Sequence, residues 1–137
     1  MSRGILFPND EPDLASFAER VESLGYHSLW TGELWTRDAF IALTQAADVT
    51  TDIGLGTAIA NVYGRTPATL AQAAATLNRA SDGRARLGLG TSTRKAVEDL
   101  HGMSFENPAR RLHETAELAG EFLNGSGRVS YDGELFE

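Results

Sequence analysis

Two apolar runs decide the fold, IGLGTAIA at residues 53–60 and ARLGLG at residues 85–90. Between them, Thr66 offers an N-cap oxygen and Pro67 a preset φ, so we expect a helix to begin there. Residues 81–84 are polar and end that helix. The order of strand, helix and strand predicts a βαβ unit with parallel strands. Because ligands of such folds lie at the carboxyl ends of the strands, the ends of both runs predict where a site would be.

The same alternation of strand and helix precedes this unit. Short strands are expected at residues 5–7 and 28–31. Apolar residues at helical spacing predict helices over residues 14–24 and 40–50. Strands that alternate with helices are typical of α/β proteins with a parallel sheet.

The C-terminal part begins with a polar connection over residues 91–108. A fourth helix is expected over residues 109–123, with residues 114, 117 and 121 on its charged outer stripe. The tail predicts a hairpin around Asp132 and Gly133. Four βα units in one partial domain, residues 1–137, favour the N-terminal half of a (β/α)8 TIM barrel, since a whole barrel takes about 250 residues.

A dinucleotide-binding sheet is the weaker interpretation. Its first strand would be followed by a glycine-rich turn that holds a pyrophosphate. Here that turn is PNDEP, residues 8–12, whose carboxylates would repel a phosphate. A flavodoxin-like sheet remains open at this length, but the small residues at the strand ends favour a barrel.

Composition excludes several function classes. The 137 residues include 19 acidic and 12 basic side chains, which argues against nucleic acid or an anionic membrane as a partner. There is no cysteine, so a cysteine-ligated metal and thiolate catalysis are excluded. The three histidines are far apart in the sequence, and we expect no metal site. The N-terminal apolar run is too short for a signal peptide or membrane span, which favours a cytoplasmic protein.

Five short motifs, in this order and spacing, resemble the bacterial luciferase-like flavin or deazaflavin oxidoreductases. They lie at residues 30–33, 56–59, 65–67, 81–84 and 87–92. Leu100, His101 and Gly102, with Phe105 and Pro108, resemble the branch that uses coenzyme F420. Leu34 stands where a common family pattern has a histidine.

The resemblance implies an eight-stranded barrel and a site for the ring of F420, or alternatively FMN. It implies a cis peptide bond between Ala58 and Ile59, on a bulge that supports the ring. Glu33 is the candidate catalytic residue, at the carboxyl end of its strand. The remaining cofactor-binding candidates are Thr57, Asn61, Gly90, Thr91 and Ser92. Core packing is the favoured role of Trp30, although Trp30 and Trp35 flank Glu33 and could form an aromatic wall. We expect structural hydrogen bonds from Arg65 and Arg84.

The function implied is hydride transfer between F420 or FMN and a small organic substrate, by a truncated or split chain. One alternative is a non-catalytic half-barrel that serves as a remnant or assembly module. A second is an FMN-dependent monooxygenase. Half a barrel leaves two open sheet edges, so we expect self-association or pairing with a complementary half-barrel.

Overall fold

The computed structural model describes residues 2–33, 35–125 and 127–137 of the chain. Its elements, in chain order, are β1 Gly4–Leu6, α1 Leu14–Ser23, β2 Ser28–Thr31, α2 Ala39–Val49, β3 Gly54–Thr57, β4 Ala60–Asn61, α3 Pro67–Ala80, β5 Ala85–Arg86, β6 Leu89–Gly90, the π-helix η1 Ala96–Leu100 and α4 Pro108–Asn124. None of the helices in these ranges is long and apolar enough to cross a membrane.

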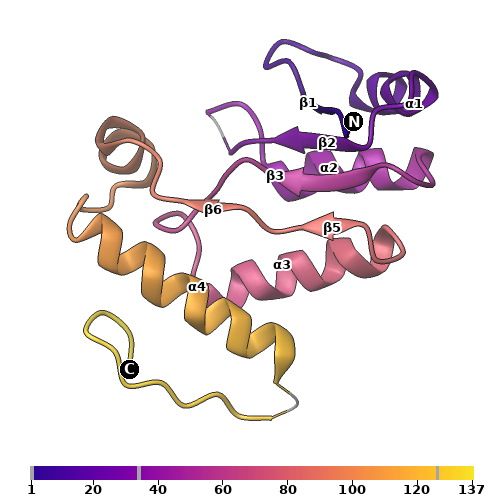
Figure 1. Cartoon of the computed structure of the whole chain (residues 1–137). Helices are drawn as coiled ribbons and strands as arrows, with labels where there is room; N and C mark the ends of the chain where they lie inside the picture. The colour runs from indigo at the N-terminus through magenta and orange to yellow at the C-terminus, as the bar shows by residue number, and fades with distance from the viewer. Residues whose placement is uncertain (1, 34, 126) are drawn as a thin grey trace.

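The main sheet is parallel and has the strand order β1-β2-β3-β5, which follows the chain (Figure 1). A second, two-stranded parallel sheet pairs β4 with β6. Leu29 and Leu55 face the helices and are fully buried in the core with Leu43 of α2 and Leu70 of α3. The α/β class and the parallel order expected from the sequence are confirmed.

Side-chain oxygens cap the N-termini of α1, α2 and α3. Asp13 caps α1 by accepting the N–H of Ser16, and Asp38 caps α2 by accepting that of Ile41. Thr66 caps α3 as expected, with Pro67 in the first helical position.

Each of the two apolar runs forms two strands, where the sequence predicts one. Between β3 and β4, the peptide bond that joins Ala58 to Ile59 is cis, as the resemblance implied. Between β5 and β6, Gly88 hydrogen-bonds to the Thr57 side chain, with Gly88 N donating to Oγ1 at 2.8 Å and Oγ1 donating to Gly88 O at 2.7 Å. A side chain thus replaces part of the backbone ladder, which is why the strands are interrupted.

The expected C-terminal hairpin is wrong. Residues 127–137, all described, contain no strand, and they run as a strap along α4 (Figure 1). The prediction that Glu114 lies on an exposed stripe is wrong for the same reason. Its side chain is 2% exposed and accepts the backbone N–H groups of Glu134 and Leu135, which a hairpin would have used for pairing.

Candidate functional site

The carboxyl ends of the strands bring four of the expected site residues together. Ala58 N donates to Thr31 O at 2.7 Å, and Glu33 N donates to Ile59 O at 3.0 Å, so the loop after β2 lies against the Ala58–Ile59 step. On its other side, Val62 N donates to Gly90 O at 3.0 Å. Glu33, Ala58, Ile59 and Gly90 therefore form one surface.

The accessible part of this surface is mostly backbone and small side chains. Ala58 is exposed, and Ile59, Gly90, Thr91 and Ser92 are half-buried. A Cβ atom on Gly90 would lie 2.8 Å from the side chain of Ile59, so glycine lets these two strand ends approach each other. Ser92 has a φ of 58°, which turns the chain away from the strand end.

Thr57 and Asn61 lie behind this surface. Both are buried, at 1% and 2% exposure. Thr57 Oγ1 is occupied by Gly88, and Asn61 Oδ1 accepts the N–H of Tyr63 at 3.0 Å. Their side chains therefore hold the bulged backbone in place.

Glu33 is part of an ion-pair network. Arg65 Nε donates to Glu33 Oε1 at 2.7 Å, and Asn61 N donates to Oε2 at 2.9 Å. The same guanidinium forms an ion pair with Asp38, the N-cap of α2. Burial would lower the pKa of Arg65, but the hydrogen bonds and charges of Glu33 and Asp38 outweigh it and raise that pKa. The carboxylate of Glu33 is thus held as an acceptor, and its oxygens link β2 to β4.

A cavity of about 520 Å³ opens beside this network at the carboxyl ends of the strands. Glu33, Arg65 and Trp35 line it, and Trp35 is 56% exposed. His101, which follows η1, covers Gly64, where a Cβ would lie 2.7 Å from the imidazole. Leu34 is adjacent in sequence but lies outside the described residues.

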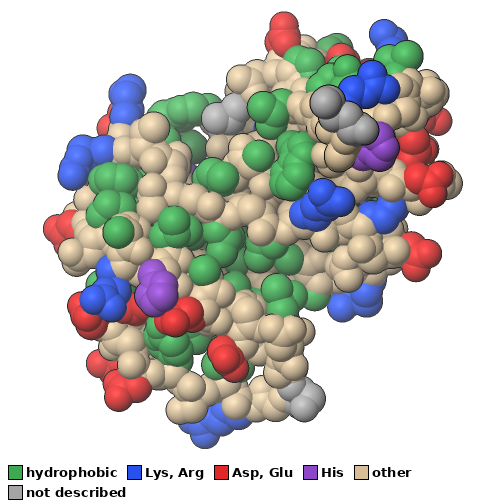
Figure 2. Space-filling model, viewed as in Figure 1, with side chains coloured by type: hydrophobic (Ala, Val, Ile, Leu, Met, Phe, Trp, Pro, Cys, Tyr) green, Lys and Arg blue, Asp and Glu red, His purple; other side chains and the backbone are tan. Residues whose placement is uncertain are grey.

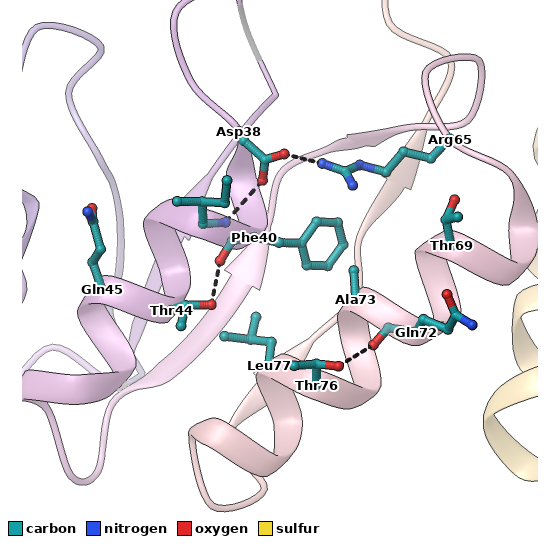
Figure 3. A pocket seen from close by; sticks show the side chains of 11 residues that line it. Asp38, Phe40, Thr44, Gln45, Arg65, Thr69, Gln72, Ala73, Thr76 and Leu77 are labelled. Carbon is teal, nitrogen blue, oxygen red and sulfur yellow. Dashed lines mark hydrogen bonds and ion pairs between the residues drawn. The ribbon is translucent and has the colours of Figure 1, made fainter.

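A second cavity, of about 570 Å³, lies between α2 and α3 on the helical side (Figure 3). The two cavities meet at the ion pair of Asp38 and Arg65, drawn at the upper edge of Figure 3. Thr44 and Thr76 line this second cavity, and their hydroxyl groups already form hydrogen bonds within their own helices. Thr44 donates to Phe40 O, and Thr76 donates to Gln72 O. The accessible surface of this groove is therefore mainly apolar, although polar and apolar residues both line it.

Gly32 and Gly88, near the strand ends, do not leave space for a ligand. A Cβ on Gly32 would lie 2.9 Å from Ala58 O, and one on Gly88 would lie 2.2 Å from Thr57 O. These glycines allow neighbouring backbones to approach. The accessible part of this surface is the exposed Ala58 with the half-buried edge from Gly90 to Ser92.

Two residues of the site have structural roles that sequence reasoning did not fully assign to them. Asp38 was not singled out, although its place before the apolar stripe of α2 is a typical N-cap signal. Arg65 was expected to form structural hydrogen bonds, and it does so with Glu33 itself. Within the described ranges, no three His, Asp or Glu residues are placed to hold a metal ion.

Comparison with known proteins gives one consistent family. The model described as luciferase-like monooxygenase matches residues 8–137. The 5,10-methylenetetrahydromethanopterin reductase of Methanolobus tindarius is 36% identical over the whole chain, and that of Archaeoglobus fulgidus is 34% identical. The alignment covers 42% of each reductase, so this chain spans less than half the length of these relatives.

Solved structures agree with this result. The coenzyme F420-dependent tetrahydromethanopterin reductase of Methanopyrus kandleri superposes with a TM-score of 0.84 and 33% identity, over 96% of this chain and 42% of the reductase. The oxygenating constituent of 3,6-diketocamphane monooxygenase from Pseudomonas putida, in complex with FMN, has a TM-score of 0.84 at 18% identity, over 99% of this chain and 42% of that protein, and shows the fold alone. The chain corresponds to part of a luciferase-like TIM barrel.

Proposed function

Because this chain belongs to the luciferase-like monooxygenase family, a family of oxidoreductases, we propose that it forms the cofactor-ring wall of an F420-dependent oxidoreductase. The observation that carries the proposal is the surface at the strand ends, where the exposed Ala58 and the edge from Gly90 to Ser92 lie against Glu33. F420 is favoured over FMN because the F420-dependent reductase of Methanopyrus kandleri is 33% identical, while the FMN complex is similar only in fold.

In this proposal the bound deazaflavin ring supplies or accepts a hydride that is exchanged with a small organic substrate. Ala58 and Ile59 support the ring, and Gly90, Thr91 and Ser92 border its edge. Thr57 and Asn61 hold the supporting backbone from behind through their buried hydrogen bonds. The cavity of about 520 Å³ is where the substrate would lie, between Glu33 and His101.

Glu33 has a positioning role in this proposal. Both of its carboxylate oxygens accept hydrogen bonds, Oε1 from Arg65 and Oε2 from Asn61. It therefore fixes the distance between the loop after β2 and the ring support, and it places negative charge at the cavity wall.

A chimeric enzyme tests this function. The chain would replace the matched segment of the Methanolobus tindarius reductase, so that a whole barrel is formed. We expect a change in F420 fluorescence on binding, and weaker binding in a Glu33→Ala variant, because the loop after β2 loses its link to Asn61 and Arg65. Glu19→Gln, an exposed change on α1, is the matched control. A folded chimera that binds neither F420 nor FMN would contradict the proposal.

A second candidate is a non-catalytic half-barrel that acts in assembly, and the outer edges of β1 and β5 in the described sheet favour it. Turnover of F420 by the purified chain alone would exclude this candidate. The partial domain of residues 1–137 is in either case proposed to pair with further βα units, since β1 and β5 are edge strands of a parallel sheet.

A further inference from the structure

A row of four residues crosses the sheet on the face opposite the helical core. The strand register pairs Leu6 with Trp30, Trp30 with Gly56, and Gly56 with Arg86. Residues paired across a sheet project to the same side, and successive residues alternate between the two sides. The residues next to this row, Leu29 and Leu55 among them, belong to the core beneath the helices. We call the opposite side the inner face.

The inner face is flat because glycines on β3 make room for the side chains of neighbouring strands. A Cβ on Gly56 would lie 2.2 Å from the ring of Trp30, and one on Gly54 would lie 3.2 Å from Nε of Arg86. The guanidinium carbon of Arg86 is 6.0 Å from the centre of the Trp30 ring. Trp30 and Arg86 therefore lie along the sheet and form a surface on which another layer can pack.

This face is open and partly apolar. Leu6 is 59% exposed, Trp30 is half-buried and Arg86 is exposed. In the view of Figures 1 and 2, α2 lies behind β3, and hydrophobic side chains are visible over the middle of the side turned to the reader. Parallel sheets are normally covered on both sides. The inner face is thus a surface that another layer of protein is expected to cover.

Arg86 determines which charge a layer that covers the inner face must carry. Among the described residues it forms no ion pair or hydrogen bond, and its contact is with the Trp30 ring. Once the face is covered, its charge leaves water, and a buried arginine is stable only with a partner that carries the opposite charge. A second copy of this chain is a poor partner, because the rows Gly4-Ser28-Gly54 and Leu6-Trp30-Gly56-Arg86 contain no acidic residue.

We propose that further βα units, which continue the parallel sheet and close the barrel, cover the inner face and present an aspartate or glutamate to Arg86. This inference rests on the proposed pairing with further βα units and adds the charge that those units must carry. The ion pair would lie in the barrel interior, at the level of Trp30 and below the strand ends that hold the proposed ring site.

A selection experiment identifies the partner charge without assuming its position. The part of the Methanolobus tindarius reductase that this chain does not match would be displayed on yeast, with the inward-facing strand positions randomised. The whole 137-residue chain is the bait, in the wild-type form and as Arg86→Leu and Arg86→Glu variants. Arg79→Leu, which removes an exposed arginine of α3, is the matched control. Circular dichroism verifies that each bait is folded.

With the wild-type and Arg79→Leu baits, we expect Asp or Glu at one inward position, enriched about tenfold over Asn and Gln. The Arg86→Leu bait should lose this preference, and the Arg86→Glu bait should select Lys or Arg there. Two outcomes would overturn the ion pair while leaving the proposal that further βα units close the barrel. One is that the selected binders show no acidic preference, and the other is that the Arg86→Leu bait selects the same acidic residues as the wild type. Failure to obtain any binder with any bait would overturn both.

Discussion

Thr57 and Gly88 exchange two hydrogen bonds across the interrupted strands, one in each direction, at 2.7 and 2.8 Å. The hydroxyl of Thr57 is both donor and acceptor for the same residue, in a site that is 1% exposed. It takes the place of a ladder bond between β3 and the segment that joins β5 to β6. This side-chain oxygen therefore adds to the backbone hydrogen bonds that hold the proposed ring support.

Thr57→Val removes this oxygen while nearly keeping the shape of the side chain. The N–H group of Gly88 then loses its partner, while its C=O keeps the N–H of Ala60, and we expect the free energy of unfolding to fall by about 1–3 kcal/mol. Urea denaturation followed by circular dichroism measures the change. Thr76→Val on the exposed side of α3 is the control and should change stability much less. Equal effects for both variants would show that the bridge contributes nothing.

Glu22 predicts a pH dependence of stability. Its carboxylate accepts the N–H groups of Thr51, Asp52 and Ile53. Burial would raise the pKa of Glu22, but these hydrogen bonds and the charge of Arg84 outweigh it, so the pKa is lowered below its ordinary value of 4.5. A lowered folded-state pKa means that the stabilisation is complete above pH 4.5 and is lost as the pH falls through the folded-state value.

Glu22→Gln should therefore destabilise the protein by about 1–2 kcal/mol at neutral pH. The difference from the wild type should shrink as the pH falls from 4.5 through the lower folded-state pKa, since the unfolded state binds the proton first and the folded carboxyl is protonated last. Thermal unfolding at a series of pH values measures both quantities. Glu19→Gln on the same helix serves as the control. A difference that stays constant down to acid pH would contradict this assignment.

Glu114 predicts how the C-terminal strap is attached. Burial would raise the pKa of Glu114, but the N–H groups of Leu135 and Glu134 outweigh it and lower that pKa. Glu114→Ala should release the strap, so the amides of residues 134 and 135 should exchange hydrogen faster and trypsin should cleave sooner at Arg128. Mass spectrometry detects both changes. Glu117→Ala, which removes an exposed hydrogen bond from Tyr131 and a contact with His113, should have a smaller effect. Unchanged exchange in the Glu114 variant would exclude this anchor.

Asp38 combines two roles that substitutions can separate. Asp38→Ala removes the N-cap of α2 and the ion pair with Arg65, whereas Asp38→Ser keeps a capping oxygen. We expect the alanine variant to be about 1 kcal/mol less stable than the serine variant. Both should loosen Arg65 and thereby Glu33. Denaturant titrations measure the difference in stability. The loosening of Arg65 and Glu33 should appear as weaker F420 binding in the chimera. Equal stability of the two variants would show that the cap is unimportant.

The sequence predicted those parts of the fold that depend on neighbouring residues. The bounds of β2 and the start of α3 at Pro67 follow from local patterning and capping. Arg84 was expected to make structural hydrogen bonds, and it donates to the backbone oxygens of Ala47, Thr50, Ile53 and Ser81. The patterns that predict β2 and the start of α3 lie within a few residues of those elements. The role of Arg84 was predictable because a guanidinium has many hydrogen-bond donors.

What could not be predicted depends on contacts between distant residues. Glu114 looks like part of a charged stripe until the strap, twenty residues later, folds back over it. The interruption of the second apolar run at Gly88 depends on a hydroxyl that is 31 residues away in sequence. The π-helix Ala96–Leu100, in what was expected to be a plain connection, buries Val97 against Val62 and Tyr63. Local periodicity contains no information about such partners.

The stacking of Trp30 on Gly56 makes the indole a natural optical probe of the inner face. A ring that lies along the sheet beside a guanidinium is open to water on one side, and its emission depends on that exposure. In a Trp35→Phe background it would be the sole source of tryptophan fluorescence. A shift of its emission to shorter wavelength would then report, without any label, the moment at which another layer closes over the sheet.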